Sequence, residues 1–449
     1  MTRALIALLV AGCTVPREAG FPDVQKLVGD RGVERIQWNR GGPEDEQVAA
    51  LVRDLLQKDL TIATATEVAL LNNARLQATY ERLGVAQADL VQAGLLRNPT
   101  LAASLHVPIS GGGPAFTAQT GYEVSIVGEF LDLFLMPLRK RFARAELERV
   151  KLDVGDAVLD LAAQVRAAFY TVQAAQQMAQ MRATIVEAAQ ASAELAARQH
   201  EAGNLSDLDL ASEQALYAQA RLDLQRSQAQ LLADREHLTE LLGLWGRNVE
   251  WKLTAPLPDL PPAEPKLDHV ETFAIEHRLD LKAARAEVEI AAASLNLTRK
   301  TRFISAASLG GHIDKDPEGV TFAGPNLELQ LPIFDQGQAS VARLAAQLRQ
   351  AQKLMDARAV AIRSQVRAAR ARLLANRSAV EYYRATLLPI RERIVKLSQQ
   401  RYNAMLLGVY QLLQARQAEA NAYREYIEAV RDYWMARSDL ERAMGGPVK

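Results

Sequence analysis

The chain has 449 residues, and its 53 basic side chains are balanced by 53 acidic ones. This balance excludes the strongly basic surface with which proteins bind nucleic acid. The single cysteine excludes a disulfide within the chain and a metal site built from several cysteines. Aromatic residues make up only 6%, and Ala, Leu, Gln, Glu and Arg dominate the middle of the chain, which favours long helices and coiled coils.

The N-terminal residues have the pattern of a bacterial lipoprotein signal. Arg3 precedes a short apolar run that ends in small residues before Cys13. Such a run is typical of a secretory signal, and the letters LVAGC resemble a lipobox. We therefore expect residues 1–12 to be removed and Cys13 to carry lipid, with a lone buried cysteine as the alternative. Thr14 is compatible with sorting to the outer membrane, and residues 13–60 then form a lipid-anchored segment.

The first half of the chain passes from helix to strand spacing. A helical pattern over about 67–96 ends before Pro99, because the residue preceding a proline disfavours helix. In the next stretch every second residue is apolar, as in a strand with one buried face. This alternation predicts strands over about 101–109 and 116–130, with the glycine-rich turn 111–114 between them.

After Pro137 the apolar residues recur alternately four and three positions apart, which is the seam of a coiled coil. A helix from there to about Gln199 is roughly 100 Å long at about 1.5 Å per residue. A break at Gly203 and a returning helix predict a long hairpin over 137–244. The seam residues are Val154, Val158, Leu161, Val165, Ala168, Val172, Ala175 and Ala179.

The same pattern then recurs after a proline-rich linker, 256–270. A helix over about 272–301 leads to strands over about 304–313 and 321–332. A second heptad hairpin follows over 336–444. The first repeat thus covers 61–255 and the second covers 271–446.

The two halves correspond at a spacing of about 203 residues, so the fold is built from an internal repeat. Asp132 corresponds to Asp335, and Gly243 corresponds to Gly446. Two strands per half give only four, and a sheet of four strands has open edges that cannot lie in lipid. Three copies would give twelve strands, an even number within the range of outer-membrane barrels.

Several short motifs resemble the TolC family of outer-membrane factors. Residues 331–337 (LPIFDQG) are similar to its strand-to-helix junction, and Asn98-Pro99-Thr-Leu is similar to the start of its first strand. Residues 198–210 and 401–416 resemble its two hairpin tips. The resemblance covers about 60–446. The chain departs from the family pattern at the first junction, 129–137, and at Met405, where the family often has glycine.

The resemblance implies a mostly α fold with a small β part. It implies two structural repeats, each of two transmembrane strands and a long coiled-coil hairpin. As a homotrimer these would form a 12-stranded β-barrel and an α-helical barrel.

The implied function is that of the outer-membrane channel component of a tripartite efflux or type I secretion system, a passive duct and not an enzyme. The partners implied are a periplasmic adaptor, an inner-membrane pump of RND or ABC type, and outer-membrane lipid. No cofactor and no nucleic acid are implied. Drugs, metal ions and polypeptides all remain open as cargo.

The resemblance also suggests functional residues at the hairpin tips. A helix turn exposes apolar side chains and unpaired backbone groups that a partner can cover, although these residues can also serve only to close the hairpins. The expected adaptor-binding residues are Arg198, Gly203, Leu205, Ser206 and Leu208 in the first tip and Arg401, Leu407, Gly408 and Leu412 in the second.

Family members can also close the periplasmic mouth with rings of carboxylates. Here Gln411 and Gln414 stand where acids would be expected, and Asp209 is the nearest carboxylate. We expect a periplasmic gate that depends more on packing and amide hydrogen bonds than on charge. The alternative for Asp209 is a solvated acid in the first turn of a helix, favoured by the helix dipole.

No group of residues has metal-ligand or catalytic spacing. His106 and His312 lie in or beside predicted strands, where we expect them to face a lumen or a lipid interface rather than a metal. Two other functions remain open. A coiled-coil scaffold lipoprotein without transport would explain the heptads but not the repeated strands, and a lipoprotein porin without an efflux role would not need such long hairpins.

Overall fold

A computed structural model describes residues 15–33, 35–107, 120–253, 256–265, 267–303, 307–316 and 319–447. Cys13, the predicted signal segment and parts of the predicted strands (108–109, 116–119 and 304–306) therefore lie outside the described residues. The chain divides into two compact units, which are described separately. The first unit is Met1–Pro22, Glu81–Asp153 and Asp280–Arg358, and the second is Asp23–Tyr80, Val154–Leu279 and Ala359–Lys449.

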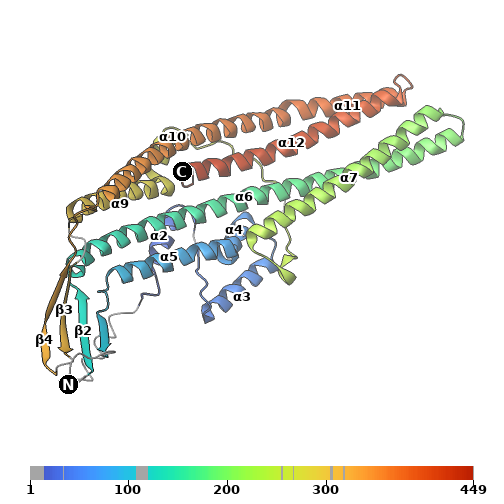
Figure 1. Ribbon diagram of the computed structural model, residues 1–449. Helices are drawn as coiled ribbons and strands as arrows, with labels where there is room; N and C mark the ends of the chain where they lie inside the picture. Colours follow the sequence, from blue (N-terminus) through green and yellow to red (C-terminus); the bar gives the residue numbers. More distant parts are fainter. Residues whose placement is uncertain are drawn as a thin grey trace. The chain divides into compact units, whose positions relative to one another are not determined.

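Most of the chain is helical (Figure 1). The α-helices are α2 (Phe21–Gly29), α3 (Pro43–Gln57), α4 (Ile62–Asn72), α5 (Ala74–Ala93), α6 (Asp132–Glu201), α7 (Asp207–Leu242), α8 (Val270–His277), α9 (Leu279–Thr301), α10 (Gln338–Tyr382), α11 (Leu388–Asn403) and α12 (Val409–Met444). A 3₁₀ turn covers Gly246–Val249 and a π-helical turn covers Tyr383–Leu387. None of the helices in the described ranges is long and apolar enough to cross a bilayer.

The first unit contains one antiparallel sheet. Its strands are β1 (Thr100–His106), β2 (Gly121–Glu129), β3 (Ala307–Lys315) and β4 (Thr321–Leu329), and they lie in the order β1-β2-β3-β4. The first two strands therefore come from one repeat and the last two from the other. β4 ends before Pro332, which has no N–H to continue the ladder.

The second unit contains most of the two helical hairpins, α6–α7 and α10–α12 (Figure 1). Their heptad seams are buried, and on α6 Val154, Val158, Val165 and Val172 are fully buried. On α10, the seam is buried from Ile362 onward, in agreement with the spacing of apolar residues. The other buried seam residues are Val366, Ala369, Leu373 and Val380.

Each predicted helix that precedes a sheet segment is in fact two helices. The pattern over 67–96 breaks at Asn73, between α4 and α5, and the pattern over 272–301 breaks at Arg278, between α8 and α9. Asn73 donates from Nδ2 to the carbonyl of Leu241 (2.9 Å), and Arg278 donates from Nη1 to that of Ala443 (3.3 Å). The side chain at each break thus donates to a carbonyl in the last turn of another helix, where carbonyls have no partner within their own helix.

α7 and α12, whose C-terminal carbonyls accept these hydrogen bonds, end in the same way. After α7 the Gly243 N–H donates to the carbonyl of Glu240, and after α12 the Gly445 N–H donates to that of Arg442. Both glycines have left-handed φ angles, 68° and 79°, as a Schellman motif requires. The equivalent of Gly243 is therefore Gly445, not Gly446 as the sequence spacing predicted, because only Gly445 adopts the left-handed angle.

The helix before the second tip is also interrupted, which the heptad pattern did not predict. At the π-helical turn the Leu388 N–H bonds to the carbonyl of Tyr383, five residues back. Pro389 follows directly and has no N–H for the carbonyl of Ala385. Local widening of a helix at such a point is a common response to a lost bond.

The proline-rich linker is held against the second hairpin. Arg377 of α10 donates to the carbonyls of Pro261 and Pro262 (both 3.0 Å) and pairs with Glu264 at 3.0 Å. Trp434 of α12 donates to the carbonyl of Pro258 (2.9 Å). The linker is thus fixed by both helices rather than free in solvent.

We predict that Gly243→Ala destabilises the protein more than Gly203→Ala. Both glycines have left-handed φ angles, so each alanine costs about 1–2 kcal/mol. A Cβ at Gly243 would also lie 2.7 Å from the carbonyl oxygen of Asn72, whereas one at Gly203 meets open space. This overpacking adds about 1–3 kcal/mol. Denaturant midpoints of the two variants measure the difference, and equal midpoints would contradict the proposed packing of α7 against Asn72.

Candidate functional site

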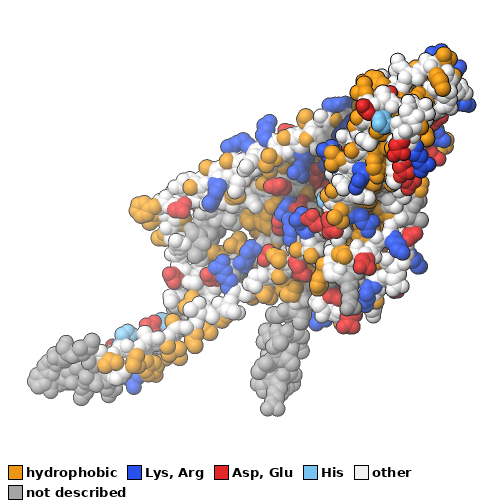
Figure 2. All heavy atoms as spheres, turned by 90° about the vertical axis from the view of Figure 1, so that its right-hand side faces the viewer, with side chains coloured by type: hydrophobic (Ala, Val, Ile, Leu, Met, Phe, Trp, Pro, Cys, Tyr) orange, Lys and Arg blue, Asp and Glu red, His pale blue; other side chains and the backbone are white. Residues whose placement is uncertain are grey.

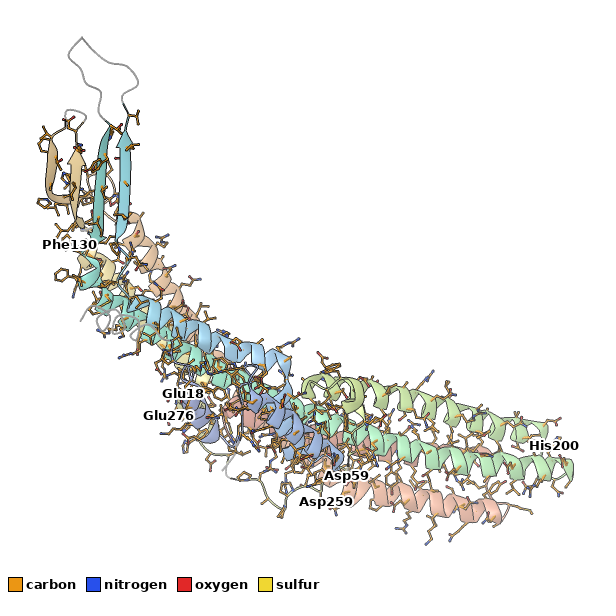
Figure 3. The ribbon with its side chains drawn as sticks, turned by 90° about the horizontal axis from the view of Figure 1, so that it is seen from below. Glu18, Asp59, Phe130, His200, Asp259 and Glu276 are labelled. Atoms are coloured by element: carbon orange, nitrogen blue, oxygen red, sulfur yellow. The ribbon has the colours of Figure 1, made fainter. Side chains whose placement is uncertain are left out.

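The first hairpin tip is a Schellman turn followed by a capped helix. The Gly203 N–H donates to the carbonyl of His200, and the Asn204 N–H donates to that of Gln199, both at 2.8 Å. Ser206 then caps α7 by accepting the backbone N–H of Asp209 (3.1 Å). Figure 3 shows His200 at this end of the hairpin.

The second tip repeats this geometry with different residues. Met405 and Leu406 donate to the carbonyls of Tyr402 and Arg401, both at 2.9 Å. Met405 has a φ of 61° and is 94% exposed. The spacing from Gly203 to Met405 equals that from Gly243 to Gly445, so Met405 occupies a glycine position, at a cost of about 1–2 kcal/mol. The sequence analysis noted Met405 where the family often has glycine. The structure shows that Met405 adopts the left-handed backbone angle that glycine favours.

Most of the predicted tip residues are accessible, but one is not. Leu208 is 76% exposed, while Leu205 and Leu407 are half-buried. Leu412 is only 5% exposed, so it packs inside the hairpin and offers almost no surface to an adaptor. Its heptad spacing after Gly408 could have shown this. The remaining predicted residues are exposed, namely Arg198, Gly203, Ser206, Arg401 and Gly408.

Sequence reasoning missed three apolar residues at the second tip. Met405, Leu406 and Tyr410 are 94%, 76% and 66% exposed. Tyr410 is the repeat counterpart of Leu208, so the internal repeat was the signal that could have identified it. The second tip therefore presents more apolar surface than its sequence suggested.

The three predicted gate residues are not joined in this structure. Asp209 accepts a hydrogen bond from the Ser206 hydroxyl (2.7 Å), and Gln411 Oε1 accepts the Gly408 N–H (3.0 Å). Both are the third residue of a returning helix, but only Gln411 caps the helix with its side chain, whereas the Asp209 carboxylate binds the hydroxyl of the capping Ser206. Gln414 is exposed. Within the described chain, no hydrogen bond joins Asp209 to either glutamine.

The first tip also contains a side-chain hydrogen bond whose residues have no counterpart in the second. His200 Nε2 lies 2.6 Å from Asp207 Oδ1, across the turn. The equivalent residues of the second tip are Tyr402 and Val409. The two tips therefore share backbone geometry but differ in charge.

The sheet has one apolar face and one polar face. The register places most of the large apolar residues of the four strands on the same side, with Val127 and Phe322 on the other, because facing residues in an antiparallel ladder share a face. In Figure 2 hydrophobic side chains gather along one side of the sheet. The apolar residues of this face are Leu101, Ala103, Leu105, Tyr122, Val124, Ile126, Ala307, Leu309, Ile313, Ala323, Pro325, Leu327 and Leu329, and Lys315 and Thr321 lie at its end.

The opposite face is rich in polar groups. His106 and His312 both lie on it, as does Glu123, which stands directly opposite Asp314. Like charges in facing positions destabilise a sheet, so this pair requires contact with water or counterions. The apolar side chains of the other face are exposed, for example Leu101 (70%) and Leu105 (67%). This is the reverse of a sheet that packs on a protein core.

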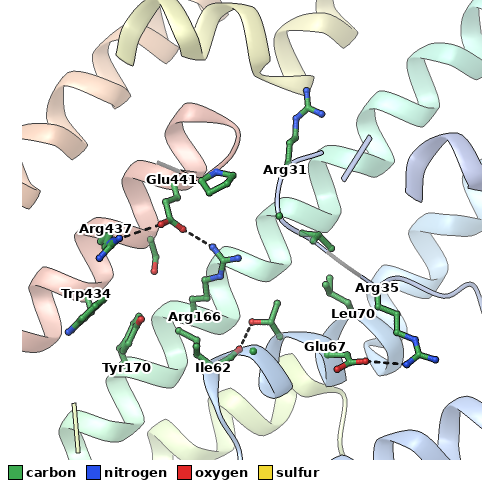
Figure 4. A pocket seen from close by; sticks show the side chains of 16 residues that line it. Arg31, Arg35, Ile62, Glu67, Leu70, Arg166, Tyr170, Trp434, Arg437 and Glu441 are labelled. Carbon is green, nitrogen blue, oxygen red and sulfur yellow. Dashed lines mark hydrogen bonds and ion pairs between the residues drawn. The ribbon is translucent and has the colours of Figure 1, made fainter. Parts of the chain in front are cut away.

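A charged cavity of about 790 Å³ lies among the loop after α2 and helices α4, α6 and α12. Figure 4 shows Glu441 between Arg166 (2.8 Å) and Arg437 (3.9 Å), and Arg35 beside Glu67 (3.5 Å). Burial raises the pKa of Glu441, while the two arginines act to lower it. Both acids of the lining face arginines, so this cluster serves to join helices.

The order and repetition of these elements match a known family along most of the chain. A family model described as "Outer membrane efflux protein" matches residues 65–244 and 273–446, one match for each repeat. The chain belongs to the outer membrane efflux protein family. The TolC-like resemblance of the sequence motifs is thereby confirmed.

Curated relatives and solved structures agree with this membership. The chain is 26% identical over 309 residues to the cobalt-zinc-cadmium resistance protein CzcC of Cupriavidus metallidurans, covering 66% of this chain and 68% of that protein. It is 27% identical over 297 residues to protein CyaE of Bordetella pertussis, covering 62% and 61%. The fold is similar to that of the CmeC outer membrane channel of Campylobacter jejuni, with a TM-score of 0.75, 16% identity and 86% of each chain covered.

These comparisons establish an outer-membrane efflux channel component with a mostly helical, TolC-like fold. They do not extend to the individual residues at the tips. The sheet with its apolar face and the two hairpin tips are therefore the surfaces from which a function must be argued.

Proposed function

We propose that three copies of this chain form one passive exit duct, the outer-membrane component of a tripartite efflux or type I secretion system. The observation that carries this proposal is the sheet. Its apolar face is exposed, and its edge strands β1 and β4 pair on one side only within the described residues. Such a sheet is incomplete as a monomer, both in water and in lipid.

Pairing with neighbouring copies would supply partners for the open strand edges and would place the apolar face in lipid. If β1 of one copy pairs with β4 of the next, three copies give a closed barrel of twelve strands, an even number typical of outer-membrane barrels. The apolar face then meets lipid, and the polar face with Glu123 and Asp314 lines the lumen.

The hairpins also carry apolar residues that the single chain leaves uncovered. On α11, Ile390, Ile394 and Leu397 are 49%, 40% and 49% exposed. They are spaced four and three residues apart, which is the spacing of a coiled-coil seam. We infer that this seam packs against a neighbouring copy, so that the helices form an α-helical barrel.

The exposed tips support contact with a periplasmic adaptor. Leu208, Leu406 and Tyr410 form apolar knobs on two turns of related geometry. A partner helix hairpin could cover them together with the exposed backbone groups of Gly203 and Gly408. An inner-membrane pump, of RND or ABC type, would supply the energy, and lipid on Cys13 would anchor the N-terminus.

The sheet predicts opposite outcomes for two adjacent substitutions. Val124→Arg puts a charge on the apolar face, which costs about 2–4 kcal/mol near the bilayer midplane. Ser125→Arg puts the same charge on the polar face. We expect Val124→Arg to remove the heat-modifiable trimer from outer-membrane fractions. Ser125→Arg should assemble and shift ion selectivity toward anions. Equal loss, or equal tolerance, would contradict the assignment of the two faces.

The gate hypothesis is tested by single-channel conductance with divalent cations. Because Asp209 accepts a hydrogen bond from Ser206 in this structure, we expect Asp209→Asn to keep the tip folded. If the gate depends on packing and on Gln411 and Gln414, block by divalent cations will be equal in the wild type and the variant. A large loss of block would instead assign the gate to the Asp209 carboxylate.

A further inference from the structure

The four helices of the two hairpins enclose a second cavity, separate from the tips, the sheet and the arginine cluster. Its volume is about 320 Å³. This lies at the lower end of the roughly 300–1,000 Å³ found for small-molecule pockets. Its walls are mainly apolar and come from all four helices: Met181, Ile185 and Ala189 of α6, Leu216 of α7, Val395 of α11 and Leu413 of α12.

Two carboxylates lie near one another at the cavity. Glu419 lines it, and burial together with repulsion from Glu392 raises the pKa of Glu419. Tyr423, also in the lining, donates a hydrogen bond from its hydroxyl to Glu392. Arg416 is the cationic residue in the described lining, and its charge acts to lower the pKa of Glu419, while its guanidinium donates to the neutral amide of Gln399 (2.6 Å). The two carboxylates, Glu419 in the lining and Glu392 beside Tyr423, therefore outnumber the one guanidinium.

A third carboxylate lies outside the lining, on the same helix as Leu216. Glu213 precedes Leu216 by one turn on α7 and is 4% exposed. Its Oε2 atom has no hydrogen-bond partner among the described residues. A buried carboxylate without a partner is unfavourable, and a positive charge nearby would reduce this cost.

We propose that this cavity binds a small organic cation with an apolar body, such as an aryl-alkyl ammonium. The ammonium group would lie against Glu419 and Glu392, and the apolar body would fill the space among Met181, Ile185 and Leu216. An uncharged molecule of the same shape gains only the apolar contacts. The site lies within one copy and does not require the trimer or transport.

The test compares phenethylammonium with 2-phenylethanol, its neutral counterpart of equal size, by calorimetry on the full chain in lipid nanodiscs. We expect the cation to bind at least tenfold more tightly. Glu419→Gln should reduce cation affinity at least fivefold and leave the alcohol unchanged. Equal affinity for both probes, or an unchanged cation affinity in Glu419→Gln, would overturn the proposal.

Filling the cavity gives an independent test with a matched control. Ala189 is buried in the wall, and Ala191 is an exposed alanine on the same helix. Ala189→Leu should abolish binding of both probes, whereas Ala191→Leu should bind them as the wild type does. Cation binding retained in Ala189→Leu would show that the probe binds elsewhere. The thermal midpoint of each variant establishes that it is folded.

Discussion

Backbone groups at the edges of a sheet need hydrogen-bond partners, and this need constrains the whole molecule. β1 and β4 each pair on one side only within the described residues, and the apolar face between them has no covering layer. In lipid, every unpaired N–H or C=O costs several kcal/mol. A chain whose described residues supply four strands would complete such a sheet with strands from neighbouring copies, as we propose. The repeated strands and hairpins are the parts that such an assembly would use.

The two repeats end their return helices with the same backbone geometry. Each return helix ends at a left-handed glycine, Gly243 or Gly445, packed beside a helix break at Asn73 or Arg278. The breaks bind the terminal carbonyls with different side chains, an amide in one repeat and a guanidinium in the other. Backbone geometry is thus retained where side-chain chemistry has diverged. The tips show the same relation, since Met405 keeps the turn that Gly203 forms.

The long-range pattern of the sequence predicted the architecture well. Strand alternation and heptad spacing depend on burial along a whole element, and Val154 or Val366 lies in the core for that reason. Local departures were harder to predict. The breaks at Asn73 and Arg278 depend on carbonyls far away in the sequence, at Leu241 and Ala443. Pro389, beside the π-helical turn, is a local signal of an interruption. The apolar pattern continues across it, however, so that pattern alone predicted an unbroken helix.

Predictions for individual site residues were weaker, because function at the tips depends on exposure. Leu412 and Tyr410 are two residues apart, yet one is buried and the other is exposed. Asp209 and Gln411 lie where a gate would be expected, yet here Asp209 binds the capping Ser206 and Gln411 caps its own helix. A family motif gives the position of a residue in the chain but not the neighbours that its side chain contacts.

The mass of the intact particle extracted from the outer membrane tests the central claim most directly. Native mass spectrometry in a mild detergent should give a single species with three times the mass of the mature chain. A particle with the mass of one chain, under conditions that retain the sheet at β1–β4, would contradict closure by neighbouring copies.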